Sequence, residues 1–117
     1  MNAYLTTIGR KTGKERRVRL YAWPDADRFV IVGSKGGAAR DPAWAHNLRA
    51  EPRATLQVGK QVLAVRATEA TGGERERLWG LVTEAFRYYA AYQRRTKRLI
   101  PLFVLERANG AERPEPA

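Results

Sequence analysis

Cysteine is absent from the 117-residue sequence, and histidine occurs once, as His46. The lack of cysteine excludes a disulfide scaffold, a thiolate nucleophile and any zinc or iron–sulfur site that needs cysteine ligands. A single histidine excludes a metal site or a catalytic pair built from two histidines of one chain. We interpret His46, which lies in a short expected helix, as a structural residue, and the sequence predicts no metal site.

Long apolar runs are also missing. No stretch approaches the roughly 18 apolar residues that a membrane-spanning helix needs, and the first residues lack the apolar core of a secretory signal. These absences predict a cytoplasmic protein without a transmembrane segment. The length and the hydrophobic share of 44% predict one domain over residues 1–108, followed by a disordered C-terminal tail at residues 109–117.

Positive charge is abundant, since 22 Lys and Arg against 12 Asp and Glu give a net charge of +10. Residues 10–19 hold six basic side chains and one acidic one, and residues 94–98 form a second basic run without an acid. Such surfaces attract small polyanions, nucleic acid or anionic lipid, so charge alone leaves three partner classes open, peripheral membrane contact included. The first run has no aromatic residue before Tyr21, which favours a discrete anion over specific nucleic acid. A merely solvated basic surface fits the composition equally well.

Short alternating apolar segments separated by turn residues predict a mainly antiparallel α+β fold. A tight turn is expected at residues 24–27, and Gly59-Lys60 is expected to close a two-residue hairpin. Asp41 is expected to cap the first helix, with Pro42 as its first residue, and residues 71–74 have the pattern of a capping box. The expected strands are residues 4–8, 18–23, 29–32, 54–58, 62–69 and 101–105, and the expected helices are residues 42–50 and 72–97. Six strands joined by hairpins indicate an antiparallel barrel with two helices packed outside.

A glycine-rich loop at residues 33–37 precedes the first expected helix. Its backbone N–H groups are suited to holding an anion, and Lys35 adds a positive charge. The spacing of a Walker A loop and that of a dinucleotide-binding fingerprint are both absent, which argues against hydrolysis of ATP or GTP and against a Rossmann site. An ordinary connection between a strand and a helix is an equally good interpretation of this loop.

Four aromatic residues, Trp44, Tyr88, Tyr89 and Tyr92, are candidates to stack on a planar ligand. Core packing is the alternative for Trp44 and Tyr89, because Tyr89 continues the apolar stripe of the second expected helix. Tyr88 and Tyr92 are four residues apart, so one of them is expected to face outward.

Taken together, these segments resemble the deazaflavin-dependent nitroreductase family, the small split β-barrel oxidoreductases of actinobacteria that use coenzyme F420. The resemblance extends over residues 4–106, and its separate motifs occur in the family's order. The chain departs from the family's usual residues at Arg19, Ala45 and Phe86. The matching stretches are residues 5–13, 16–21, 33–37, 42–44, 46–52, 89–93 and 100–106.

The resemblance implies a six-stranded antiparallel split β-barrel that binds coenzyme F420, an 8-hydroxy-5-deazaflavin. The family pattern assigns the phosphate and glutamate tail of the coenzyme to Arg10, Lys11, Thr12 and Arg16. It assigns the deazaflavin ring to Val32, Gly33, Ser34 and Lys35 on one side and to Ala43, Trp44 and Asn47 on the other. Tyr21 completes the implied coenzyme-binding set.

The implied reaction is transfer of a hydride from the reduced deazaflavin to a small organic acceptor of the quinone, nitro or enone type. Ser34, Tyr89 and Tyr92 are the implied catalytic and acceptor-side residues. A homodimer is also expected, because related split barrels often dimerise. Two alternatives stay open: a reductase of the same fold that uses FMN, and a non-catalytic protein that binds a coenzyme, a lipid or nucleic acid.

Overall fold

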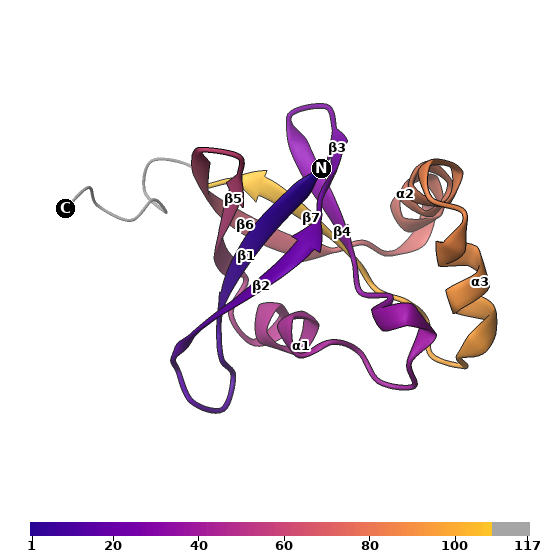
Figure 1. Ribbon diagram of the computed structural model, residues 1–117, viewed down its shortest axis with the longest axis horizontal. Helices are drawn as coiled ribbons and strands as arrows, with labels where there is room; N and C mark the ends of the chain where they lie inside the picture. The colour runs from indigo at the N-terminus through magenta and orange to yellow at the C-terminus, as the bar shows by residue number, and fades with distance from the viewer. Residues whose placement is uncertain (109–117) are drawn as a thin grey trace.

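A computed structural model describes residues 1–108 and shows one curled antiparallel sheet with helices at two of its sides (Figure 1). The predicted tail, residues 109–117, lies outside the described residues. The sheet order is β2-β1-β5-β6-β7-β4-β3. The strands are β1 (Asn2–Ile8), β2 (Glu15–Tyr21), β3 (Trp23–Asp25), β4 (Arg28–Val32), β5 (Arg53–Val58), β6 (Gln61–Glu69) and β7 (Leu102–Arg107). The helices are α1 (Ala43–Ala50), α2 (Gly72–Ala85) and α3 (Tyr88–Arg95), with a single 3₁₀ turn, η1 (Lys35–Gly37).

Side-chain alternation places one row of apolar residues on the inner face of the sheet. Leu5 of β1 pairs with Leu56 of β5, which in turn pairs with Leu63 of β6, and all three side chains are buried. Strand β7 lies between β6 and β4 and is buried on both faces over Leu102–Leu105. One face of β7 packs on α2 and α3, and the other faces the interior of the curled sheet. This two-sided burial explains the unbroken apolar run of β7.

The described residues form seven strands, whereas the sequence predicted six. The segment predicted as one strand over residues 18–23 is divided at Ala22, which is buried and exchanges backbone hydrogen bonds with Met1. Pro24 was expected to begin a turn but lies in the short edge strand β3. At the edge of the sheet, proline is tolerated because its position does not need a backbone N–H for strand pairing. The turn follows at Ala26, whose φ is +56°.

The second predicted helix is two helices, so the described residues hold three α-helices rather than two. Phe86 has extended backbone angles and separates α2 from α3. Its ring lies 4.8 Å from that of Tyr89 and 5.3 Å from that of Tyr88, measured between centroids. The break therefore accompanies an aromatic cluster, and neither glycine nor proline marks it in the sequence.

The two predicted helix caps do not form through side chains. Pro42, rather than Asp41, is the N-cap of α1, and the Asp41 carboxylate instead accepts hydrogen bonds from Arg49 and Arg98. Thr71 is the N-cap of α2 without a capping hydrogen bond from its side chain. Gly59 has a φ of +60° and closes the β5–β6 hairpin as predicted.

A network of charged side chains ties the β3–β4 hairpin to α2. The Asp25 carboxylate accepts hydrogen bonds from Arg28 and Arg77, and both arginines also pair with Glu74 at the start of α2. Hydrogen bonding from Arg77, followed by that from Arg28, lowers the pKa of Asp25 below its usual value of 3.8.

The lowered pKa of Asp25 predicts that acid weakens the fold through this network. The carboxylate stabilises the folded state fully above its unfolded-state pKa, and that contribution is lost as the pH falls through the lower folded-state pKa. Urea unfolding from neutral pH into the acid range should therefore show a smaller loss of stability in Asp25→Asn than in the parent. Equal acid slopes for the two proteins would contradict the role of this carboxylate.

Candidate functional site

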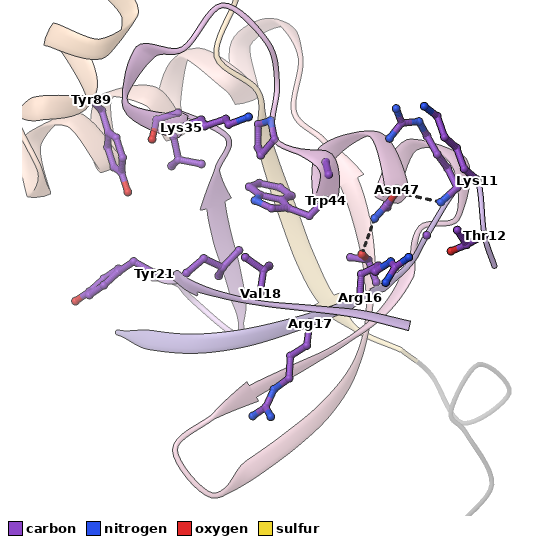
Figure 2. A pocket seen from close by; sticks show the side chains of 18 residues that line it. Lys11, Thr12, Arg16, Arg17, Val18, Tyr21, Lys35, Trp44, Asn47 and Tyr89 are labelled. Atoms are coloured by element: carbon purple, nitrogen blue, oxygen red, sulfur yellow. Dashed lines mark hydrogen bonds between the residues drawn. The ribbon is translucent and has the colours of Figure 1, made fainter. Parts of the chain in front are cut away.

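One pocket of about 710 Å³ lies between the β1–β2 hairpin, the loop after β4 and helix α1. Its lining brings together segments that are far apart in the sequence (Figure 2). The lining residues are Thr7, Gly9, Arg10, Lys11, Thr12, Arg16, Arg17, Val18, Leu20, Tyr21, Val32, Ser34, Lys35, Pro42, Ala43, Trp44, Asn47 and Tyr89. Every residue of the predicted coenzyme-binding set except Gly33 is among them.

One end of the pocket is basic and open to solvent. Arg10, Lys11 and Arg16 are exposed there, and within residues 1–108 none of their side chains forms an ion pair. The loop that carries them is held by its own backbone, because Gly9 N donates to Lys14 O at 2.8 Å and Gly13 N donates back to Gly9 O at 2.8 Å. The positive charge of these three side chains is therefore available to an anionic ligand.

A buried amide connects this basic loop to the sheet. Asn47 of α1 donates from Nδ2 to Thr7 Oγ1 at 3.1 Å, and its Oδ1 accepts the backbone N–H of Arg10 at 3.1 Å (dashed lines in Figure 2). Asn47 and Thr7 are the two buried polar residues of the described core. The pair therefore sets the position of the basic loop relative to α1.

Replacing Asn47 by alanine is expected to destabilise the protein by about 1–3 kcal/mol, because it leaves the Arg10 N–H and the Thr7 hydroxyl without their partner. Chemical unfolding measures this loss. Gln57→Ala is a suitable control, since the Gln57 amide makes its hydrogen bonds at the exposed surface. A loss no greater than that of the control would contradict the bridging role of Asn47.

The middle of the pocket is largely apolar. Trp44 is half-buried, lines the pocket and packs edge-on against Phe103 of the core. The prediction that it packs in the core is confirmed, and its stacking on a planar ligand stays a prediction. Val18 and Leu20 of β2 line the pocket together with Val32 at the end of β4. Ser34 and Lys35, which Gly33 separates from Val32, bring polar groups to the same wall. This part of the pocket suits a flat, mostly apolar ring with a polar edge.

The end of the pocket opposite the basic loop is aromatic, and Figure 2 shows Tyr21 and Tyr89 there. The indole N–H of Trp23 donates to the Tyr89 hydroxyl oxygen at 3.0 Å. Burial raises the pKa of Tyr89 above its usual value of 10, so the phenol stays protonated at neutral pH. Because an indole N–H only donates, the Tyr89 proton is left to be donated to another group.

Two predicted site residues lie outside the lining. Gly33 sits behind the wall, where its N–H donates to Pro101 O at 2.9 Å. Tyr92 packs beside the pocket, with its ring centroid 6.5 Å from that of Tyr89. Tyr88 faces outward, as expected for one of the two tyrosines on α3.

Six lining residues were not among the predicted site residues: Thr7, Gly9, Arg17, Val18, Leu20 and Pro42. The two-residue period of β1 contained a signal for Thr7, because it continues the inward series of Ala3 and Leu5. Arg17 reaches the pocket edge, but its guanidinium lies 4.1 Å from the centre of the Tyr4 ring and points away from the other labelled side chains in Figure 2.

Within residues 1–108, no group of three or more His, Asp or Glu side chains is arranged to hold a metal ion. None of the helices in this part of the chain has the length and apolar character needed to cross a membrane.

Comparison with known proteins identifies close relatives. Residues 2–107 match the model of the family described as F420H(2)-dependent quinone reductase. The F420H(2)-dependent quinone reductase Rv1261c of Mycobacterium tuberculosis is 41% identical over 106 residues, which cover 88% of this chain and 71% of that protein. A solved structure of an F420-H2 dependent reductase, FDR-A, is 42% identical with a TM-score of 0.82, and covers 90% of this chain and 93% of the other. A second solved structure, described as a domain-swapped dimer, is also 42% identical with a TM-score of 0.82, and covers 90% of this chain and 79% of the other.

Proposed function

This chain belongs to the F420H(2)-dependent quinone reductase family, and from that premise we propose that it reduces a quinone with a hydride taken from coenzyme F420 bound in the pocket of Figure 2. Membership of this family makes coenzyme F420 the cofactor, and the alternative of FMN finds no support among the matches. The single observation that carries the proposal is one pocket with a basic end, an apolar middle and a phenol at the far end.

The donor set of the pocket fits the coenzyme. The coenzyme has an anionic tail of a phosphodiester and glutamates, and Arg10, Lys11 and Arg16 offer unpaired cations for it. FMN, with one phosphate, would leave much of this charge without a partner. The bound coenzyme supplies the hydride, and the residues of the chain supply orientation, electrostatics and exclusion of water.

The residues of the ring-binding wall have separable tasks. Trp44 and Val18 offer apolar surface to a planar ring, and Ser34 and Lys35 offer polar groups to its edge. At the aromatic end, the protonated Tyr89 hydroxyl is available to donate a hydrogen bond to a carbonyl oxygen of the acceptor, on which negative charge develops as the hydride arrives. Quinones are the acceptors that the family description supports, and nitro and enone compounds are further acceptors to be tested.

Assembly as a homodimer is part of the proposal, supported by the dimeric relative. Nucleic acid is expected to bind only weakly and without sequence preference, because the basic surface supplies an electrostatic attraction that falls steeply with salt. Sedimentation measurements and salt-dependent binding assays test these two statements separately.

Coenzyme specificity tests the proposal. Titration with oxidised coenzyme F420 should show saturable binding. FMN should bind more weakly under the same conditions, because its single phosphate gives the basic end of the pocket fewer anionic groups to bind. Tighter binding of FMN would contradict the proposal. Coenzyme binding without any oxidation of the reduced form by quinones would instead identify a carrier.

Replacing Ser34 by alanine is expected to lower the rate of hydride transfer by about three- to tenfold while changing coenzyme affinity less, because a contact made mainly in the transition state affects kcat. Single-turnover oxidation of the reduced coenzyme, together with an equilibrium titration, separates the two quantities. An unchanged transfer rate would remove Ser34 from the mechanism.

A further inference from the structure

Arg98, in the connection between α3 and β7, makes four hydrogen bonds with one short segment, residues 33–41. Its Nε donates to Ala38 O at 2.7 Å, its Nη2 to Ser34 O at 2.8 Å, and its Nη1 to Gly33 O at 3.1 Å and to Asp41 Oδ1 at 2.7 Å. The side chain is only 13% exposed.

The segment that Arg98 holds is under backbone strain. Lys35, Gly36 and Gly37 have φ values of +45°, +62° and +82°, so three successive residues lie in the left-handed region, one of them with a side chain. Two hydrogen bonds hold the turn from within, from Gly37 N to Ser34 O and from Ala38 N to Lys35 O. Glycine adopts this region freely, so Lys35 carries the strain, and the hydrogen bonds from Arg98 support the turn from outside.

Charge balance does not explain the arrangement. Asp41 is already paired with Arg49, whose Nη1 lies 2.9 Å from Oδ2, so the carboxylate has a cation without Arg98. Three of the four acceptors of Arg98 are uncharged carbonyls. Recognition of carbonyls in several directions needs the fixed planar fork of a guanidinium, which a lysine ammonium lacks.

We propose that Arg98 is a positioning residue: by holding residues 33–41 it fixes Ser34 and Lys35 in the wall of the pocket. It faces the carbonyl side of the turn and does not itself line the pocket, whereas Ser34 and Lys35 do. Its effect on the reaction rests on the proposed function: with the wall fixed, a bound ring is presented to the acceptor in one orientation, and hydride transfer is sensitive to displacements of an ångström.

Hydrogen exchange tests the proposal without turnover. Amide exchange of Gly37 and Ala38 is measured in the parent, Arg98→Lys, Arg98→Met and the control Arg94→Met, which removes an exposed arginine from α3. We expect both Arg98 variants to exchange these amides faster by about tenfold or more, while the amides of α2 and the control protein stay at parent values.

Kinetics provide the second measurement. At saturating coenzyme, hydride transfer should be slower in both Arg98 variants by about tenfold, with a smaller change in coenzyme affinity. A parent protein that does not oxidise the reduced coenzyme would overturn the proposed function, and the exchange data would still decide whether Arg98 holds the wall.

Three results would overturn the proposal. Parent-like exchange at Gly37 and Ala38 in both variants would show that the turn is held without Arg98. Parent-like exchange and kinetics in Arg98→Lys alone would show that a charge beside Asp41 is sufficient. Equal acceleration of the α2 amides, as in a variant that fails to fold, would show a general role in stability.

Discussion

Replacing Lys11 and Arg16 together by alanine is expected to weaken binding of coenzyme F420 about a hundredfold. Both side chains are exposed at the basic end of the pocket, and no ion pair within residues 1–108 occupies them. A charge-assisted hydrogen bond contributes roughly 1.5–3 kcal/mol, which is about tenfold or more in affinity for each residue. Fluorescence titration with the oxidised coenzyme measures the change.

The salt dependence of the same titration provides a second readout. Binding to the parent should weaken above about 0.1 M salt, where exposed charges are screened, and the double variant should lose most of this dependence. A variant with Lys60 and Arg94 replaced by alanine is a matched control, because it removes one lysine and one arginine from exposed positions outside the pocket lining. A double variant at Lys11 and Arg16 that binds like this control would place the anionic tail elsewhere.

Replacing Gly37 by alanine is expected to destabilise the protein by about 2–5 kcal/mol and to disturb the pocket wall. A Cβ at this position would lie 2.7 Å from the Tyr92 carbonyl oxygen and 3.1 Å from the Tyr92 Cα. Because the clash is with backbone of α3, a change of side-chain rotamer cannot relieve it. The φ of +82° adds the strain of a left-handed alanine.

Gly36 offers a matched control for this prediction. It is the neighbouring residue, its φ is +62°, and a Cβ there would meet nothing within 4 Å. Gly36→Ala should therefore cost only the left-handed strain, about 1–2 kcal/mol. Chemical unfolding of the two variants compares them directly. Equal losses would show that contact with α3 does not restrain the turn.

The strands were largely predictable because their signals are local. The inward series Ala3, Leu5 and Thr7 follows the two-residue period of β1. Gly59 indicates a hairpin because glycine readily adopts the positive φ that the turn needs. The helix break at Phe86 was not predictable, because neither glycine nor proline marks it and it accompanies a cluster of aromatic rings. The strand at Pro24 was missed because proline is typical of a turn, whereas here it pairs with Phe29 across a hairpin. The Asp41 carboxylate does not cap α1, because it accepts hydrogen bonds from Arg49 and Arg98 instead.

The site likewise contains parts that the sequence predicts locally and parts that it does not. The basic loop and the glycine-rich turn are contiguous segments, so the sequence resemblance identified residues that the fold brings to one pocket. The contacts that order the pocket cross long stretches of chain: Trp23 reaches Tyr89 over 66 residues, and Arg98 reaches Ser34 over 64. No local pattern in the sequence reports such pairs, because they arise only when β3, α3 and the turn are packed together.

The central claim is that this pocket delivers a hydride from coenzyme F420 to a quinone. The most direct measurement is stopped-flow absorbance of the reduced coenzyme, bound to the protein, after mixing with a water-soluble naphthoquinone. We expect reoxidation of the coenzyme that depends on protein and quinone and becomes slower in the variant lacking Lys11 and Arg16 when coenzyme is limiting. Reoxidation at the rate of the protein-free mixture, across a panel of quinones and with the coenzyme shown to be bound, would contradict it.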